Sequence, residues 1–91
     1  MKEQQIQAKK IKELEENGYY VIKLVKTNKN GIPDVVAIHG QTEAFFIEVK
    51  KPDGVESKLQ KFRAKELESQ GIRSYVVYGY DDYLNKVGKY L

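Results

Sequence analysis

The sequence predicts an α/β fold in which helices flank a mixed four-stranded sheet, in the order α-β-β-β-α-β-α. Two patterns carry this prediction. Short runs rich in β-branched and aromatic residues alternate with longer stretches rich in Glu, Gln, Lys and Leu, which are good helix formers. A short turn before the third run predicts an antiparallel hairpin, whereas a helix before the fourth run predicts a parallel crossover.

Residues 2–17 are predicted to form the first helix, which Gly18 is placed to end. At about 100° per residue, one side of this helix carries both apolar and polar side chains. The members of this stripe are Glu3, Ile6, Gln7, Lys10, Ile11 and Leu14. If the helix packs across the sheet through this stripe, Glu3 is directed towards a site at the sheet's edge.

Three strands are predicted next, over residues 19–25, 34–38 and 44–50. In the first of them the side chains alternate with the period of two that is typical of a strand. Pro33 suits the start of the second strand, because proline lacks the N–H group that a strand interior would use. Turn-forming residues between the second and third strands then predict a hairpin.

Residues 57–70 are predicted to form the second long helix, with Ser57 as its N-cap and Gly71 as its terminator. Residues 73–78 form a fourth strand that is almost continuously apolar, which favours an internal position in the sheet. A short last helix, capped by one of the aspartates at positions 81 and 82, is expected to run to residue 87.

The composition limits the classes of protein to which the chain can belong. Of its 91 residues 41% are hydrophobic, enough for one modest core, so residues 1–91 are expected to form a single domain. The sequence contains no apolar run of membrane-spanning length and no signal-peptide pattern. Cysteine is absent, which excludes disulfides and thiolate metal sites. We therefore expect a cytoplasmic protein that binds metal, if any, through oxygen ligands or its one histidine.

The positive charge is compatible with a polyanionic partner. The net charge is +3 and the pI about 9.0, with fourteen lysines but only Arg63 and Arg73. Arginine is suited to bidentate recognition of guanine, whereas lysine is a compact charge suited to phosphate. If the protein binds nucleic acid, its composition favours recognition of the backbone or of shape. A lysine-rich surface that merely keeps the protein soluble remains the alternative.

One motif concentrates chemically useful side chains. The stretch Gly-Ile-Pro-Asp ends at Asp34, and fourteen residues later the third strand closes with Glu48 and Lys50. Positions i and i+2 of a strand share a face and lie roughly 6.6 Å apart. Asp34 begins the neighbouring strand of the same hairpin, so the three side chains should converge. Two carboxylates beside a lysine suit a hard ion such as Mg²⁺ or Mn²⁺ and suggest chemistry on phosphate.

Each candidate residue also has a structural interpretation when it is taken alone. Asp34 follows a proline and suits a turn, while Glu48 and Lys50 suit the solvated face of an edge strand. Glu3 suits the first turn of a helix because of the helix dipole. Gln60 suits an exposed helix surface.

Taken together, these motifs resemble the PD-(D/E)XK nuclease superfamily, which has a restriction-endonuclease-like core. The resemblance rests on Gly-Ile-Pro-Asp, an apolar strand, a turn, Phe-Phe-Ile-Glu-Val-Lys, and the downstream pair Ser57 and Gln60. More narrowly, the chain resembles the VRR-NUC (virus-type replication-repair nuclease) family in a minimal stand-alone form. The resemblance covers nearly the whole chain, from Glu3 to the fourth strand.

The resemblance implies roles for individual residues. Asp34 and Glu48 match the metal-binding carboxylates, and the main-chain carbonyl of Val49 matches a further ligand of Mg²⁺ or Mn²⁺. Lys50 matches the lysine that acts on the attacking water. Because Lys50 stands beside carboxylates, we expect it to position the water and stabilise charge rather than to act as the general base.

Two further positions match the family outside the central motif. Glu3 matches an acidic residue early in the first helix and is a less central candidate for metal binding. Gln60 matches a glutamine that the family carries on its second helix. Both are therefore candidate catalytic residues.

The resemblance and the lysine excess together predict a metal-dependent DNA endonuclease of phage or mobile-element type. Small family members act as homodimers and favour flaps or branched junctions, so we expect the same here. The lysines expected to contact the DNA backbone are Lys23, Lys26, Lys29 and Lys51. Two alternatives remain open: a nucleic-acid-binding module without catalysis, and a strict Holliday junction resolvase of the same superfamily.

Overall fold

The structure is a computed structural model that describes residues 2–40 and 43–88. It contains the predicted elements in the predicted order, so the expected fold class is confirmed. The elements are α1 (Glu3–Glu16), β1 (Tyr20–Lys23), β2 (Val35–His39), β3 (Glu43–Lys50), α2 (Lys58–Ser69), β4 (Arg73–Tyr78) and α3 (Gly79–Val87).

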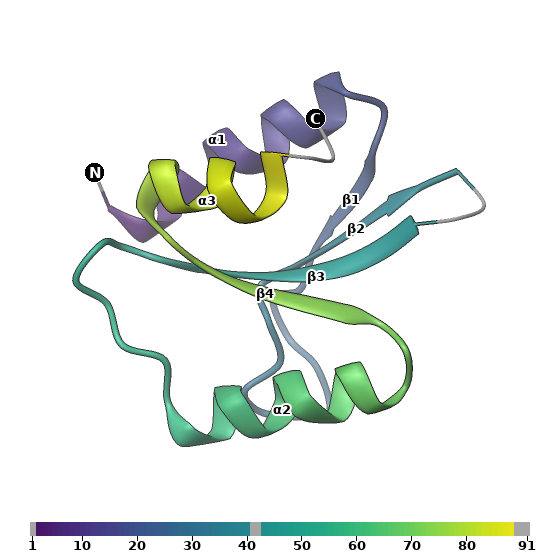
Figure 1. Ribbon diagram of the computed structural model, residues 1–91, viewed down its shortest axis with the longest axis vertical. Coiled ribbons are helices and arrows are strands. Elements are labelled where there is room, and N and C mark those ends of the chain that lie inside the picture. The colour runs from purple at the N-terminus through teal and green to yellow at the C-terminus, as the bar shows by residue number, and fades with distance from the viewer. Residues whose placement is uncertain (1, 41–42, 89–91) are drawn as a thin grey trace.

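The four strands form one mixed sheet in the order β1-β2-β3-β4 (Figure 1). β1 and β2 pair antiparallel, as do β2 and β3, which confirms the predicted hairpin. β3 and β4 pair parallel across the crossover that α2 provides. β4 is therefore an edge strand, and the expectation that its apolar run lies inside the sheet is wrong. The side chains of β4 are covered instead by the helices α3 and α2, which pack near this strand.

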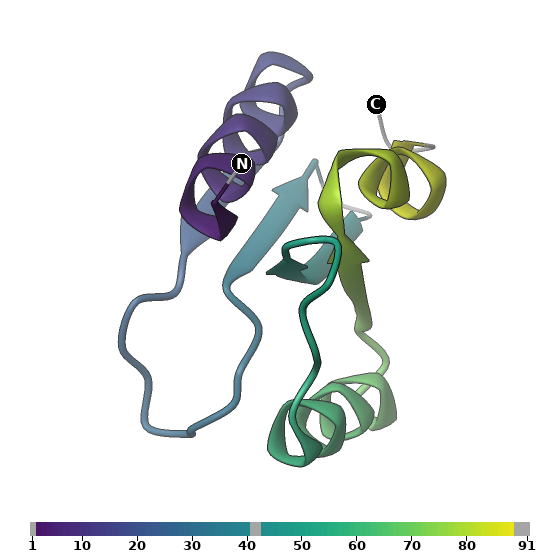
Figure 2. The same ribbon diagram turned by 90° about the vertical axis from the view of Figure 1, so that its left-hand side faces the viewer.

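The helices lie in two layers on either side of the sheet. α1 and α3 cover one face, and α2 runs beneath the other, as the two perpendicular views make clear (Figures 1 and 2). The long segment between β1 and β2 descends from the sheet on the same side as α2 (Figure 2). The segment between β1 and β2 and the helix α2 thus lie on the same side of the sheet.

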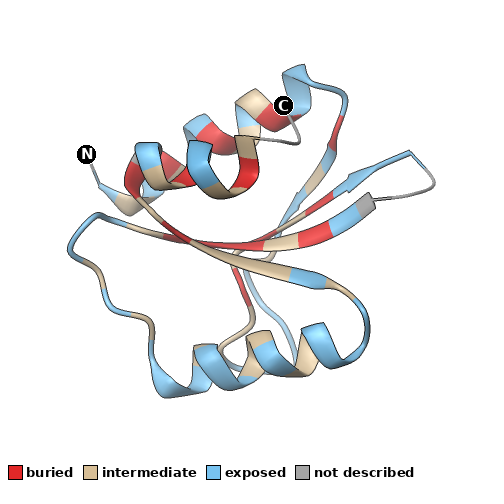
Figure 3. Cartoon of the chain, viewed as in Figure 1, coloured by how far each residue is buried: buried red, intermediate tan, exposed pale blue. Residues whose placement is uncertain are grey.

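The hydrophobic core lies between the sheet and the pair α1 and α3. Its buried residues are Ile6, Leu14, Tyr19, Val35, Ala37, Phe45, Ile47, Val49, Val77, Tyr83 and Val87. Figure 3 shows the buried positions on α1, α3 and the strands, whereas α2 has no buried residue along its length. The α2 face of the sheet is therefore the more open of the two.

The predicted stripe on α1 is the face that packs on the sheet. Ile6, Lys10 and Leu14 are all buried, which follows the helical spacing expected from the sequence. Lys10 is only 1% exposed, and its Nζ lies 4.0 Å from the centroid of the Tyr83 ring of α3. Burial is the largest cause that lowers the pKa of Lys10 to about 8.

Two element boundaries differ by more than one residue from those expected. β1 ends at Lys23 rather than at residue 25, because the chain leaves the sheet after Leu24 donates its N–H to the carbonyl of Asp34. α3 begins at Gly79, with Tyr78 as its N-cap, so neither of the expected aspartates is the N-cap. Asp82 nevertheless accepts the N–H of Tyr78 at 2.8 Å from within the first turn.

None of the helices in residues 2–40 and 43–88 is both long enough and apolar enough to cross a membrane.

Candidate active site

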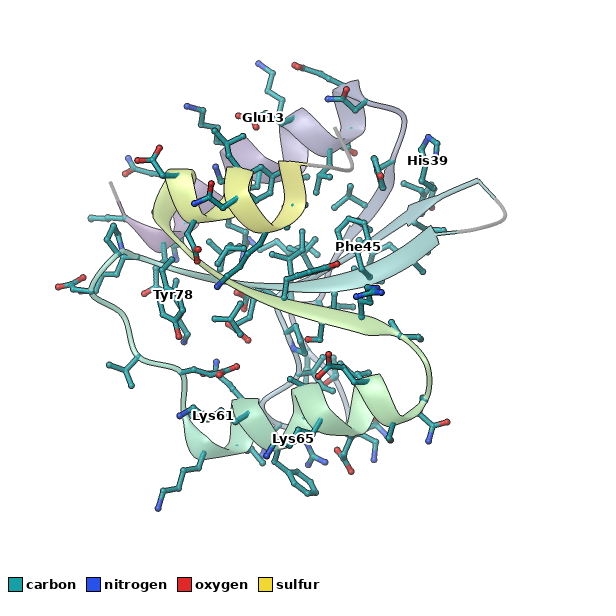
Figure 4. The ribbon with its side chains drawn as sticks, viewed as in Figure 1. Glu13, His39, Phe45, Lys61, Lys65 and Tyr78 are labelled. Carbon is teal, nitrogen blue, oxygen red and sulfur yellow. The ribbon has the colours of Figure 1, made fainter. Side chains whose placement is uncertain are left out.

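Asp34 and Glu48 lie across from each other on neighbouring strands. Val35 pairs with Ile47, so Asp34, the residue before β2, stands opposite Glu48. Directly opposed residues of an antiparallel pair project to the same face of the sheet. The alternate residues of β3, including Phe45, are buried in the core beneath α1 and α3. The two carboxylates therefore project to the α2 face, opposite to the side chain of Phe45, which Figure 4 labels.

The carboxylate of Asp34 is held by the main chain of β3. Its Oδ2 accepts a hydrogen bond from the N–H of Val49 at 3.0 Å. Pro33, immediately before it, is buried, and the carbonyl of Asp34 accepts the N–H of Leu24 at 2.7 Å. Asp34 is thus tied both to β3 and to the end of β1, which orients its side chain before any ligand binds.

Glu48 is a buried carboxylate, which is unusual for a charged side chain. The residue is 3% exposed, and its Oε1 receives no hydrogen bond from any residue that the structure describes. Burial above all, and then the adjacent Asp34, raise the pKa of Glu48 to about 8, while Lys50 acts in the opposite direction. Without a cation, Glu48 is mostly protonated at neutral pH.

Lys50 projects to the same face as Glu48, as the spacing of two residues predicted. Its Nζ lies 4.0 Å from Oε2 of Glu48, and its side chain is 15% exposed. The separation is at the outer limit of an ion pair, so the ammonium group can turn towards a third partner. Asp34, Glu48 and Lys50 therefore converge as the sequence analysis expected.

The pair of carboxylates suits a divalent cation. A buried carboxylate oxygen without a hydrogen-bond donor is costly, and a bound cation would remove that cost. Asp34 and Glu48 offer oxygen ligands only, which favours hard ions such as Mg²⁺ or Mn²⁺. Among the described residues no three acidic or histidine side chains gather closely enough to form a cage. The remaining ligands would come from the main chain, water or substrate.

The proposed ligands outside this pair differ in their placement. Val49 is buried between Glu48 and Lys50, and its N–H already donates a hydrogen bond to Oδ2 of Asp34. The role of its carbonyl as a ligand stays a prediction. Glu3 is partly buried in the first turn of α1 and does not join the two carboxylates in a cluster.

Gln60 has a structural function in addition to the role predicted for it. Ser57 caps α2 as expected: its Oγ accepts the N–H of Gln60 at 3.1 Å. In return, Oε1 of Gln60 accepts the N–H of Ser57 at 2.9 Å, which completes a capping box. Gln60 makes no hydrogen bond or ion pair with Lys50 or with the two carboxylates in the described structure.

The four lysines expected at the DNA backbone are all exposed but lie in different places. Lys26 and Lys29 belong to the segment that leads into Asp34. Lys23 lies opposite Val35, whose side chain is in the core, so Lys23 projects to the face covered by α1 and α3 and not to the face of the two carboxylates. Lys51 follows β3 directly, and its Nζ lies 3.9 Å from Oδ1 of Asp53.

Two residues near the site were missed by the sequence analysis. Tyr78 ends β4 opposite Lys50, and Figure 4 shows its side chain on the α2 side of the sheet. Glu56 contributes negative charge that also raises the pKa of Glu48, though less than burial and Asp34 do. The parallel pairing of β3 with β4 is the signal that could have pointed to Tyr78. No spacing in the sequence singles out Glu56.

Asp34, Glu48 and Lys50 thus lie together at the paired ends of β2 and β3 in an α-β-β-β-α-β-α fold, and their assignment as a nuclease site stays a prediction. The model of the VRR-NUC domain matches residues 1–81, and the chain therefore belongs to the VRR-NUC family. This family is of nuclease type, which confirms the resemblance inferred from the motif. Comparison with the curated proteins finds no match.

Proposed function

We propose that this protein is a metal-dependent DNA endonuclease that hydrolyses phosphodiester bonds. The observation that carries the proposal is Glu48, a buried carboxylate beside Asp34 with an oxygen that lacks a donor. A structural carboxylate would be expected to have that oxygen satisfied. Membership of a nuclease-type family supports the same conclusion.

In the proposed mechanism, Asp34 and Glu48 would hold Mg²⁺ or Mn²⁺, with the carbonyl of Val49 as a further ligand. The ion, when bound, supplies an acidified water and neutralises charge on the phosphate. The hydrogen bond from the Val49 N–H already orients the Asp34 carboxylate, so this side chain needs little further ordering when the ion binds. To act as a ligand, Glu48 would lose its proton to solvent. Lys50 orients the attacking water and stabilises the negative charge that develops on phosphate.

We further propose that the substrate is flap or branched DNA, recognised through its backbone. The excess of lysine over arginine supports contacts to phosphate rather than to base edges. A domain of 91 residues offers a short footprint, so a symmetric homodimer would extend it and supply a second active site. In this proposal residues 1–91 act as one nuclease domain of phage or mobile-element origin in the host cytoplasm.

A cleavage assay tests the proposal directly. The protein is incubated with Mg²⁺ or Mn²⁺ and with supercoiled, single-stranded, flap and four-way DNA, and Asp34→Asn serves as the inactive control. We expect cleavage of flap or branched DNA that disappears with Asp34→Asn or with a chelator. Cleavage confined to four-way junctions would identify a Holliday junction resolvase instead.

The same assay separates catalysis from binding alone. A binding module would bind DNA in a salt-dependent manner, regardless of divalent metal and of Asp34→Asn, and would cut no substrate. That result would overturn the endonuclease proposal.

A further inference from the structure

The segment between β1 and β2 encloses a pocket that ends at the candidate active site. The pocket has a volume of about 300 Å³, and the described residues that line it all lie between Leu24 and Asp34. That volume is at the lower end of the range for pockets that hold small organic ligands. One loop thus forms a recess next to a carboxylate expected to bind metal.

Two lysines give the pocket a positive charge that suits an anion. Lys26 and Lys29 line it and are exposed, and neither has a carboxylate partner within 4.0 Å among the described residues. Asp34, at its end, is the only acid among the described residues that line the pocket. Thr27 Oγ1 bonds both the N–H and the carbonyl of Lys29, at 3.2 and 2.6 Å, which stabilises the turn that carries both lysines.

The loop is braced against α2 from outside the pocket. Nε of Arg63 donates to the carbonyl of Asn30 at 2.8 Å, and Nη1 of Arg63 bonds Oε1 of Glu66 at 2.7 Å. Gly31 lies so close to Leu59 that an added Cβ would stand 2.7 Å from Leu59 Cγ. These contacts hold the loop three and four residues before Asp34, so the pocket keeps a defined position relative to the site.

We infer that this pocket is a subsite for the phosphate and sugar next to the scissile phosphate of a DNA strand. Lys26 and Lys29 bind this neighbouring phosphate. Arg63 is then a positioning residue, because it shapes the pocket through Asn30 without lining it. The inference rests on the proposed function, since it requires DNA at Asp34. A phosphate bound there would draw the neighbouring phosphodiester towards the two carboxylates.

A methylphosphonate scan tests the subsite by binding alone. A labelled flap DNA carries one neutral methylphosphonate at a time, and its affinity is measured by fluorescence anisotropy in EDTA, where no cutting occurs. We expect the wild-type protein to lose affinity most strongly, by about five- to tenfold, at one or two adjacent phosphates. The double variant Lys26→Ala/Lys29→Ala should lose its sensitivity at those positions only.

Two further variants separate positioning from charge. Arg63→Ala should weaken the same position-specific effect by about threefold or more, although Arg63 does not line the pocket. Lys12→Ala removes one positive charge, as Arg63→Ala does, but from the exposed side of α1, and it should leave the pattern intact. Thermal unfolding of each variant shows whether any loss reflects a change in stability.

The outcomes distinguish this inference from the proposed function. A uniform loss at every phosphate in the lysine double variant, or an equal effect of Lys12→Ala, would overturn the subsite. Absence of DNA binding by the wild-type protein would overturn it as well. Binding with the expected position dependence but without cleavage in Mg²⁺ or Mn²⁺ would support a phosphate subsite at Lys26 and Lys29 but reject the endonuclease, and with it the scissile phosphate beside the subsite.

Discussion

The carboxylate of Asp34 accepts the main-chain N–H of Val49 at 3.0 Å, although the two residues are fifteen positions apart. This bond links the residue before β2 to the residue of β3 that lies between Glu48 and Lys50. Asp34 therefore belongs to the β2–β3 ladder as much as to the candidate site. Its structural and chemical contributions can be separated by the choice of substitution.

Asp34→Asn should abolish cleavage by at least about a hundredfold while leaving stability nearly unchanged, because the amide oxygen can still accept the Val49 N–H. Asp34→Ala should abolish cleavage and also lower the free energy of unfolding by about 1–2 kcal/mol, since the N–H loses its partner. Cleavage rates and urea denaturation measure the two effects. Full activity of Asp34→Asn would exclude Asp34 from catalysis.

Binding of Mg²⁺ or Mn²⁺ should release a proton from Glu48. With a pKa of about 8, the carboxyl group is mostly protonated at pH 7 and mostly ionised at pH 9. Apparent metal affinity should therefore rise by up to about tenfold per pH unit below pH 8 and level off above it. Isothermal titration calorimetry at pH 7, in two buffers of different ionisation enthalpy, measures the released proton. Equal heats in both buffers would contradict the assignment.

Lys10→Met should stabilise the protein at neutral pH. A pKa lowered from 10.5 to about 8 means that the fold disfavours the charged amine, and this penalty is complete below pH 8. It disappears as the pH rises from 8 to 10.5, so the variant's advantage should shrink over that range. The advantage at pH 7 is at most about 3 kcal/mol, because the contact with the Tyr83 ring offsets part of the penalty.

Urea denaturation at pH 7 and pH 9.5 measures this difference. The exposed neighbour Lys12→Met is the control and should change stability little at either pH. A Lys10→Met variant that is less stable than the wild-type protein at pH 7 would show that the favourable contacts of the amine outweigh its burial.

Gly31→Ala should destabilise the protein and slow cleavage. Gly31 has a φ of +83°, and an added Cβ would meet Leu59 Cγ at 2.7 Å, so both the backbone and the packing oppose a side chain. We expect a loss of about 2 kcal/mol or more together with a shift of the loop that leads to Asp34. Chemical denaturation and the cleavage assay measure the two effects.

Gly71→Ala provides a matched control for this prediction. Gly71 has a φ of +86° but no atom within 4 Å of an added Cβ, so only the backbone cost of about 1 kcal/mol applies and cleavage should persist. Adding Leu59→Ala to Gly31→Ala should recover part of the lost activity. Equal effects of the two glycine substitutions would show that contact with Leu59 is unimportant.

The order of helices and strands was predictable because it depends on local spacing. Helical periodicity identified the buried side of α1, Ser57 identified the start of α2, and the run of β4 was located without error. Turn residues after β2 predicted the hairpin that pairs Asp34 with Glu48. The start of α3 was misplaced, because Gly79 allows the chain to turn into the helix before the two aspartates that suggested a cap.

The position of β4 was misjudged for a different reason. An apolar run in a sequence indicates burial, but burial can come from neighbouring strands or from helices. β4 is an edge strand that packs near α3 and α2. Composition alone does not distinguish these two environments.

By itself, the sequence determined the fold class, the family motif and the convergence of Asp34, Glu48 and Lys50 on one face. These features follow from strand alternation and from a hairpin whose two strands are close together in the sequence. Only the tertiary structure decided that Glu48 is buried with a raised pKa, that Tyr78 borders Lys50, and that Arg63 braces the loop at Asn30. The reason is that burial and such contacts join segments far apart in the chain, where local periodicity carries no information.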